Sequence, residues 1–225
     1  MNIADTARLV CFQRSYIFGL FDESYDQKLS LTFDTAPFEL YPPHGVQVRT
    51  YIIDELVKNE IRERDETLTI LTLGSGLCTR ALRIGNNHEW LEVDDKRFHV
   101  QKLKVFPDYP GIHIAIDCFA PEVKEHLDCE TVVIAEGLFV YLPYKEQSKI
   151  IEMCTKRHAT LIVDYMGLKV ATYFKQFLDE VPLYPFNTDE LKVRPKKIIS
   201  LAHEGYCLGV YSDINYANQA FVAVY

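Results

Sequence analysis

The chain has 225 residues, of which 48% are hydrophobic, so it can bury a full core and is not an intrinsically disordered chain. Its formal net charge is −8, with 24 Lys and Arg against 32 Asp and Glu. Binding to nucleic acid is disfavoured, because phosphate contacts need clustered basic side chains.

The cysteines and the hydropathy pattern indicate where the protein resides. None of the six cysteines forms a CxxC pair or lies near a His at zinc-finger spacing, so we expect free thiols and no metal site. The N-terminus lacks a signal-peptide pattern, and no apolar run approaches the roughly 20 residues that cross a bilayer. We therefore expect a soluble cytoplasmic protein that binds no membrane. The oligomeric state stays open.

The first third of the chain has a helical pattern. Residues 4–21 have helical spacing of apolar positions, and residues 22–43 have the Asp, Ser, Thr and Pro content of a loop. Residues 46–63 place Val48 and Ile52 on one face, which predicts an amphipathic helix. We expect a single domain in which residues 1–65 form an N-terminal helical extension and residues 66–225 form the core.

Short apolar runs alternate with helical segments through the rest of the chain. The predicted strands are 68–73, 89–93, 112–116, 131–135 and 159–165, and the predicted helices between them are 79–84, 96–105, 121–127 and 144–157. Strands that are apolar on both faces are typical of a parallel sheet covered by helices. The pattern predicts a doubly wound, Rossmann-like α/β fold. Residues 206–212 and 218–225 are expected to close a seven-stranded, mostly parallel sheet as an antiparallel hairpin.

Glycine or an acid follows each of the first four predicted strands: Gly74, Asp94, Asp117 and Glu136. Because ligands of open α/β sheets bind outside the carboxyl ends of the strands, we expect these residues to gather at one edge. Glycine lets the backbone approach a ligand closely. A carboxylate such as Asp94, 20 residues after Gly74, can accept both hydroxyl groups of a ribose. These positions predict a nucleoside-containing cofactor.

The choice of cofactor depends on the residues around the glycines. A dinucleotide fingerprint needs GxGxxG, whereas Thr79 stands at the position of the third glycine. Acidic side chains suit the cationic S-adenosylmethionine better than a pyrophosphate, so we predict S-adenosylmethionine. Alternatively, these residues form no cofactor site: Gly74 and Gly76 would make a purely structural turn, and Asp94 and Asp117 would cap helices.

Four segments of the chain resemble the leucine carboxyl methyltransferase family, which includes polyketide O-methyltransferases. The segments are VQVRTYIIDELV (46–57), LTLGSGLCTRALRI (71–84), WLEVDD (90–95) and IAEGLFVYLP (134–143), in the order found in the family. The resemblance implies a class I methyltransferase fold of seven strands.

The resemblance also implies roles for particular residues. Arg49 would hold the methionine carboxylate of S-adenosylmethionine, and the turn of Gly74, Ser75 and Gly76 would pass close to it. Asp94 would bind the ribose. Asp117 and Cys118 would lie beside the adenine, and Glu136 would face the methionine amino group. For Arg49 the alternative is a surface ion pair on its own helix. No catalytic residue is assigned.

We therefore predict an S-adenosylmethionine-dependent O-methyltransferase that acts on a carboxylate or hydroxyl of a small molecule or protein. A carboxylate acceptor needs no general base, whereas a hydroxyl would need one, for which His44 is the candidate. Two alternatives remain open. One is a binding protein without activity, because Cys78 stands where the family has Asp and the chain is short. The other is a nicotinamide-dependent oxidoreductase.

Overall fold

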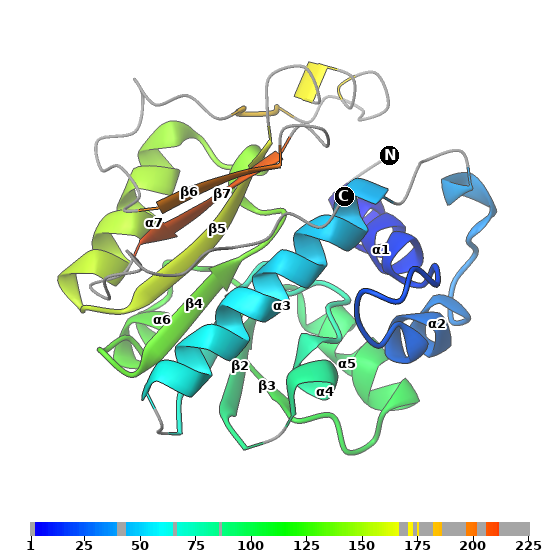
Figure 1. Ribbon diagram of the computed structural model, residues 1–225, viewed down its shortest axis with the longest axis horizontal. Coiled ribbons are helices and arrows are strands. Elements are labelled where there is room, and N and C mark those ends of the chain that lie inside the picture. The colour runs from blue at the N-terminus through cyan, green and yellow to red at the C-terminus, as the bar shows by residue number, and fades with distance from the viewer. Residues whose placement is uncertain are drawn as a thin grey trace.

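A sheet whose first five strands are parallel organises the computed structural model (Figure 1). The structure describes residues 3–39, 44–64, 67–85, 87–166, 171–172, 175, 182–185, 197–201 and 206–211. The elements in chain order are α1 (Ile3–Arg14), α2 (Ser24–Ser30), η1 (Ala36–Phe38), α3 (His44–Arg64), β1 (Thr69–Leu73), α4 (Arg80–Ile84), β2 (Glu89–Val93), α5 (Lys96–Val105), β3 (Gly111–Ala115), α6 (Pro121–Glu125), β4 (Thr131–Ala135), η2 (Phe139–Tyr141), α7 (Tyr144–Lys156), β5 (Thr160–Met166), β6 (Lys197–Leu201) and β7 (Tyr206–Tyr211).

The strand order is β3-β2-β1-β4-β5-β7-β6. The chain builds the sheet outward from β1 to β3 and then returns to place β4 on the other side of β1. This reversal creates a topological switch point between β1 and β4. In open α/β sheets the ligand crevice lies outside the carboxyl ends of the strands at such a point.

Helices cover both faces of the sheet, because its central strands are apolar on both sides. Leu71 of β1 faces a core that includes residues of α6 and α7, whereas its neighbour Ile70 faces a core that includes residues of α3 and α4. Side chains of successive strand residues point to opposite faces, so α3 lies across one face and α6 and α7 lie on the other (Figure 1). The predicted Rossmann-like α/β fold is confirmed.

A third, smaller core attaches the first two helices to this scaffold. Cys11 of α1, Leu29 of α2 and Leu77 after β1 are buried together, with Phe33 and Phe98 packed against them. The prediction of a loop over residues 22–43 is wrong in part, because α2 lies inside it. The predicted helix over 4–21 ends at Arg14. These boundaries put α1 and α2 beside the carboxyl ends of β1 and β2.

The C-terminal strands pair differently from the expected hairpin of 206–212 and 218–225. β7 lies antiparallel to β5 on one side and antiparallel to β6 on the other. Because a strand has only two hydrogen-bonding edges, β6 takes the place that we expected for residues 218–225, which lie outside the described residues. Lys197 is the first residue of β6.

Two further observations bear on the expectations from composition. Every cysteine whose side chain the structure describes is a free thiol: Cys11, Cys78, Cys118, Cys129 and Cys154. Over the same described residues, no helix combines the length and the apolar character that crossing a membrane requires.

Candidate functional site

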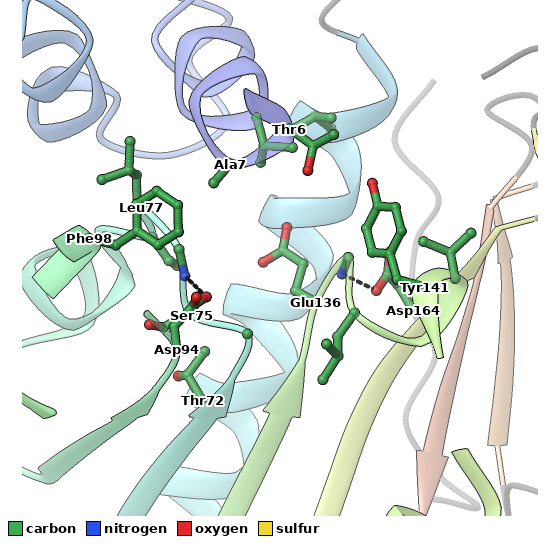
Figure 2. Close-up of a pocket in the computed structure, with 18 of the residues that line it drawn as sticks. Thr6, Ala7, Thr72, Ser75, Leu77, Asp94, Phe98, Glu136, Tyr141 and Asp164 are labelled. Atoms are coloured by element: carbon green, nitrogen blue, oxygen red, sulfur yellow. Dashed lines mark hydrogen bonds between the residues drawn. The ribbon is translucent and has the colours of Figure 1, made fainter. Parts of the chain in front are cut away.

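A cavity of about 260 Å³ lies at the carboxyl ends of the parallel strands. Its walls include Gly74 after β1, Asp94 after β2, Glu136 after β4 and Asp164 in β5. Thr6 and Ala7 of α1 close it from above, as Figure 2 shows. The cavity therefore occupies the switch point that the strand order creates.

The GSG segment after β1 forms a tight turn that only glycine permits without strain. Gly74 and Gly76 have φ of +67° and +45°, in the left-handed region that L-residues with a Cβ avoid. A Cβ on Gly76 would come within 3.1 Å of the Cβ of Ala7, and one on Gly74 within 3.3 Å of Leu138. Both glycines and the buried Ser75 line the cavity. The glycines thus let α1 and the turn approach each other.

Asp94 is bonded to this turn. Its Oδ2 accepts a 2.7 Å hydrogen bond from the amide of Gly76 (Figure 2). Its Oδ1 accepts one of 2.6 Å from the amide of Asp95. Burial raises the pKa of Asp94 above its ordinary value. The alternative that Asp94 caps the next helix is wrong, because Asp95 caps α5 by accepting from the amide of Arg97. A carboxylate has about four acceptor positions, so Asp94 retains capacity for a ligand.

Asp117 differs from the other strand-end residues. Its carboxylate is exposed, accepts a 2.8 Å hydrogen bond from the amide of Phe119, and is absent from the described wall of the cavity. The physical reason is that β3 ends at Ala115, so Ile116 occupies the position after the strand and lines the cavity. Cys118 does line it, and burial together with the Asp117 carboxylate raises the pKa of its thiol to about 11.

Arginine side chains surround Glu136. Arg49 Nε donates a 3.0 Å hydrogen bond to its Oε1, and Arg80 Nη2 donates one of 2.7 Å to its Oε2. Thr50 adds a 3.2 Å hydrogen bond to Oε1. Burial alone would raise the pKa of Glu136, but Arg80 and Arg49 outweigh burial and hold it well below its usual range. Glu136 is therefore a fixed anion in the cavity wall.

Arg49 is buried and joins two strand ends. Besides Glu136 it contacts Asp164, to which its Nη1 donates a 3.0 Å hydrogen bond. These partners are 87 and 115 residues away in the sequence. The alternative of a surface ion pair on its own helix is therefore wrong. Arg49 lies in the cavity wall with both acids.

The same contacts continue into a buried ladder of alternating charge, in which every side chain is at most 7% exposed. Its members in order are Arg14, Asp26, Arg83, Asp54, Arg80, Glu136, Arg49 and Asp164, joined by N–O distances of 2.6 to 3.1 Å. Four arginines balance four carboxylates, so the ladder is neutral as a whole. It ties α1, α2, α3 and α4 to the ends of β4 and β5.

Sequence reasoning missed several residues of the site. Asp164 interrupts the apolar strand ATLIVDY, and that interruption is the signal that could have revealed it. Its Oδ1 accepts a 2.5 Å hydrogen bond from the amide of Gly137, and burial raises its pKa. Arg80 and Thr6 also line the cavity. Nothing in the spacing of these two residues distinguishes them from ordinary helix residues.

Comparisons with solved structures identify the fold. The chain is similar to a DUF574 family protein from Streptomyces avermitilis (TM-score 0.59, 12% identity, 91% of this chain and 95% of that one). It is also similar to magnesium protoporphyrin IX methyltransferase from Synechocystis PCC 6803, solved with bound SAH (TM-score 0.51, 12% identity, 94% and 96%). A third structure is an O-methyltransferase family protein from Burkholderia thailandensis (TM-score 0.54, 14% identity, 86% of this chain).

These likenesses define the class of fold as the Rossmann-like α/β fold of methyltransferases. The chain spans 60% of the length of the Burkholderia protein. No family model matches the sequence, and the search of the curated proteins gives no match. The resemblance to the leucine carboxyl methyltransferase family therefore stays a prediction.

Proposed function

We propose that the protein is an S-adenosylmethionine-dependent O-methyltransferase, akin to the leucine carboxyl methyltransferases, that acts on a small molecule or a protein. The observation that carries this proposal is the cavity at the switch point, where the positive-φ turn of Gly74 and Gly76 is bonded to Asp94. The methyltransferases with this fold give the proposal its chemical class.

The residues of the cavity fit the proposed cofactor. Asp94 keeps acceptor positions for two ribose hydroxyls, and the glycine turn leaves room for a close approach of the backbone. At the other side lie the carboxylates of Glu136 and Asp164 (Figure 2). The Arg49 guanidinium is bonded to both of them. Charges of both signs suit the carboxylate and the amino group of a methionine portion. Asp117 is exposed and is not among the residues that line the cavity, whereas its neighbour Cys118 is.

When bound, S-adenosylmethionine supplies an electrophilic methyl group, to whose carbon an acceptor oxygen bonds while the C–S bond breaks and leaves its electron pair on sulfur. The protein has to align the acceptor with that methyl group, which can remove roughly 7–11 kcal/mol of the barrier. Arg49, fixed between Glu136 and Asp164, orients the methionine end. Leu138 and Val140 add apolar wall at the same place.

The wall of the cavity favours an acceptor that is already ionised. No histidine is among the described residues that line it, and the side chain of His44, the first residue of α3, lies outside the description. Burial raises the pKa of Tyr141, so its hydroxyl stays protonated at neutral pH and cannot act as a general base. A carboxylate needs no base, and we therefore propose a carboxylate acceptor before a hydroxyl.

Isothermal titration with S-adenosylmethionine and S-adenosylhomocysteine tests the cofactor. Asp94→Asn removes the charge that would hold the ribose, so we expect its affinity to fall about 10- to 100-fold. Asp95→Asn is the matched control, because Asn also caps helices and Asp95 lies outside the cavity wall. Absence of heat from either ligand with the wild-type protein would remove the proposal.

Transfer of a labelled methyl group to a panel of carboxylates, phenols and peptides tests the activity. Labelling of a carboxylate, reversed by mild alkali as expected for an ester, supports the proposed acceptor. Cofactor binding without transfer to any of these acceptors would favour a binding protein without activity. Tight binding of a reduced nicotinamide cofactor would instead favour an oxidoreductase over both the methyltransferase and the binding protein without activity.

A further inference from the structure

A second concave surface lies beside the cavity, on the outer side of α1 and α5. This groove, which we call the basic groove, measures about 590 Å³ and is lined by Arg8, Thr32, Phe33, Lys96, Arg97, Val100, Gln101 and Lys104. Arg8 and Arg97 follow Ala7 and precede Phe98, both of which line the cavity, so the groove begins where the cavity wall ends. The proposed function does not use it.

The groove is positive, although the chain as a whole carries a formal charge of −8. Four of its lining residues are cationic and none is acidic. Asp5 pairs with Arg8 and Asp95 with Arg97, whereas Lys96 and Lys104 make no ion pair within the part of the chain that the structure describes. Two lysine charges are therefore uncompensated on one face of α5.

The helical geometry of α5 places these charges in a row. Lys96, Val100 and Lys104 are spaced at i, i+4 and i+8, which puts them along one side of the helix. At 1.5 Å of rise per residue the two lysines lie about 12 Å apart along the axis, or about four residues of an extended peptide. The row is an elongated surface rather than a point.

The groove also holds apolar surface and an unused donor. Val100 is 39% exposed and lies between the lysines on α5, and Phe33 also lines the groove. Gln101 donates a 2.7 Å hydrogen bond to Thr32 and so holds α5 to the end of α2 across the floor. Nε of Arg8 is buried and makes no hydrogen bond to the described residues. A ligand with carboxylates and an apolar group would meet the lysines and the exposed Val100.

We propose that the basic groove binds an extended acidic peptide segment of a protein partner, with carboxylates over Lys96 and Lys104 and an apolar side chain against Val100. A short segment fits better than a nucleic acid or a membrane. The attraction of exposed charges falls off within about 8 Å at physiological salt, so a long polyanion would also meet the acidic remainder of the surface. This inference does not rest on the proposed methyltransferase function.

Fluorescence anisotropy with a labelled peptide that carries Glu at positions 1 and 5 and Leu at position 3, with Ser at the positions between them, tests the proposal, because these three side chains lie on one face of an extended chain. We expect binding that weakens as salt is added, and none to the same peptide with Gln in place of Glu. The double variant Lys96→Glu, Lys104→Glu should weaken binding about tenfold or more, because it replaces two attractions by repulsions. Lys124→Glu, Lys145→Glu makes the same change of net charge on α6 and α7 and should leave binding unchanged.

Three results would overturn the proposal. One is peptide binding that the groove variant and the control variant affect equally. Another is binding of a single-stranded oligonucleotide or of anionic phospholipid vesicles that matches or exceeds binding of the peptide. The third is no binding of the peptide at low salt by a wild-type protein whose thermal unfolding confirms that it is folded. Titration of S-adenosylhomocysteine into the groove variant, unchanged from wild type, separates this surface from the cavity.

Discussion

Nη1 of Arg49 donates a 3.0 Å hydrogen bond to Oδ2 of Asp164, and this contact joins helix α3 to the fifth strand across 115 residues of sequence. Both side chains are 4% exposed. Asp164 also accepts from the amide of Gly137, the residue after Glu136. One carboxylate therefore fixes both the arginine and the loop that follows β4, and both belong to the cavity wall.

Removal of the Asp164 carboxylate should destabilise the folded protein. Asp164→Ala takes an acceptor from the buried Arg49 charge and from the Gly137 amide, so we expect a loss of about 3–5 kcal/mol in the free energy of unfolding. Asp164→Asn keeps an acceptor and should lose less. Chemical denaturation measures both variants. The exposed Asp117→Ala, which removes one hydrogen bond from the amide of Phe119, is the comparison and should lose only about 1 kcal/mol. Equal losses for Asp164→Ala and Asp117→Ala would contradict the role of the ladder.

The ladder also predicts a dependence of stability on pH. The pKa of Glu136 in the folded protein lies well below its ordinary value of 4.5, because the arginines outweigh burial. The contribution of Glu136 to the free energy of unfolding is therefore complete above about pH 4.5 and is lost progressively as the pH falls below that value. Asp54, whose pKa Arg83 and Arg80 lower against the effect of burial, acts in the same direction.

Glu136→Gln tests this dependence. The variant should be less stable than the wild-type protein at pH 7. Its free energy of unfolding should fall less steeply between pH 5 and pH 3, because only the wild-type protein loses the stabilisation by Glu136 over that range. Urea denaturation over that range gives both curves. Parallel curves for the two proteins would show that Glu136 is not coupled to the arginines.

Much of the sheet could be predicted from the sequence, because buried parallel strands are short apolar runs that are easy to recognise. The five strands from β1 to β5 lie within one or two residues of the predicted segments. One such shift had a large effect on the site. β3 ends one residue earlier than predicted, and Ile116, although 73% exposed, lines the cavity where Asp117 does not.

The charge ladder could not be predicted, because pairing between residues far apart in sequence is set by the packing of α1, α2 and α3 on the core. Asp26 lies in a helix of seven residues whose polar sequence, SYDQKLS, favoured a loop. Arg80 and Asp54 lie on separate helices that only the tertiary structure brings to 2.6 Å. By contrast, Gly74 and Asp94 could be found, since both directly follow apolar strands.

Gly76→Ala should disturb the turn in two ways. Its φ of +45° costs an L-residue roughly 1–2 kcal/mol, and the added Cβ meets Ala7 at 3.1 Å, where α1 covers the cavity. Gly19→Ala is the matched control, since φ there is +70° and no atom lies within 4 Å of the new Cβ. Thermal unfolding should show a loss for both variants and a larger one for Gly76→Ala. Only Gly76→Ala should also weaken binding of S-adenosylhomocysteine, and equal behaviour of both variants would refute the contact with α1.

Binding of the cofactor should depend on pH through Asp94. Burial raises the pKa of this carboxyl above the ordinary value of 3.8, so it becomes protonated at a higher pH than an exposed Asp. A protonated carboxyl loses acceptor capacity, and the affinity for S-adenosylhomocysteine should therefore fall as the medium becomes mildly acidic, while the protein is still folded. Titration calorimetry between pH 7.5 and the onset of acid unfolding measures the change. Asp94→Asn should bind weakly with no such dependence, and Asp95→Asn should keep the wild-type profile. If Asp94→Asn keeps the pH dependence of the wild-type protein, then another group titrates and Asp94 does not hold the ribose.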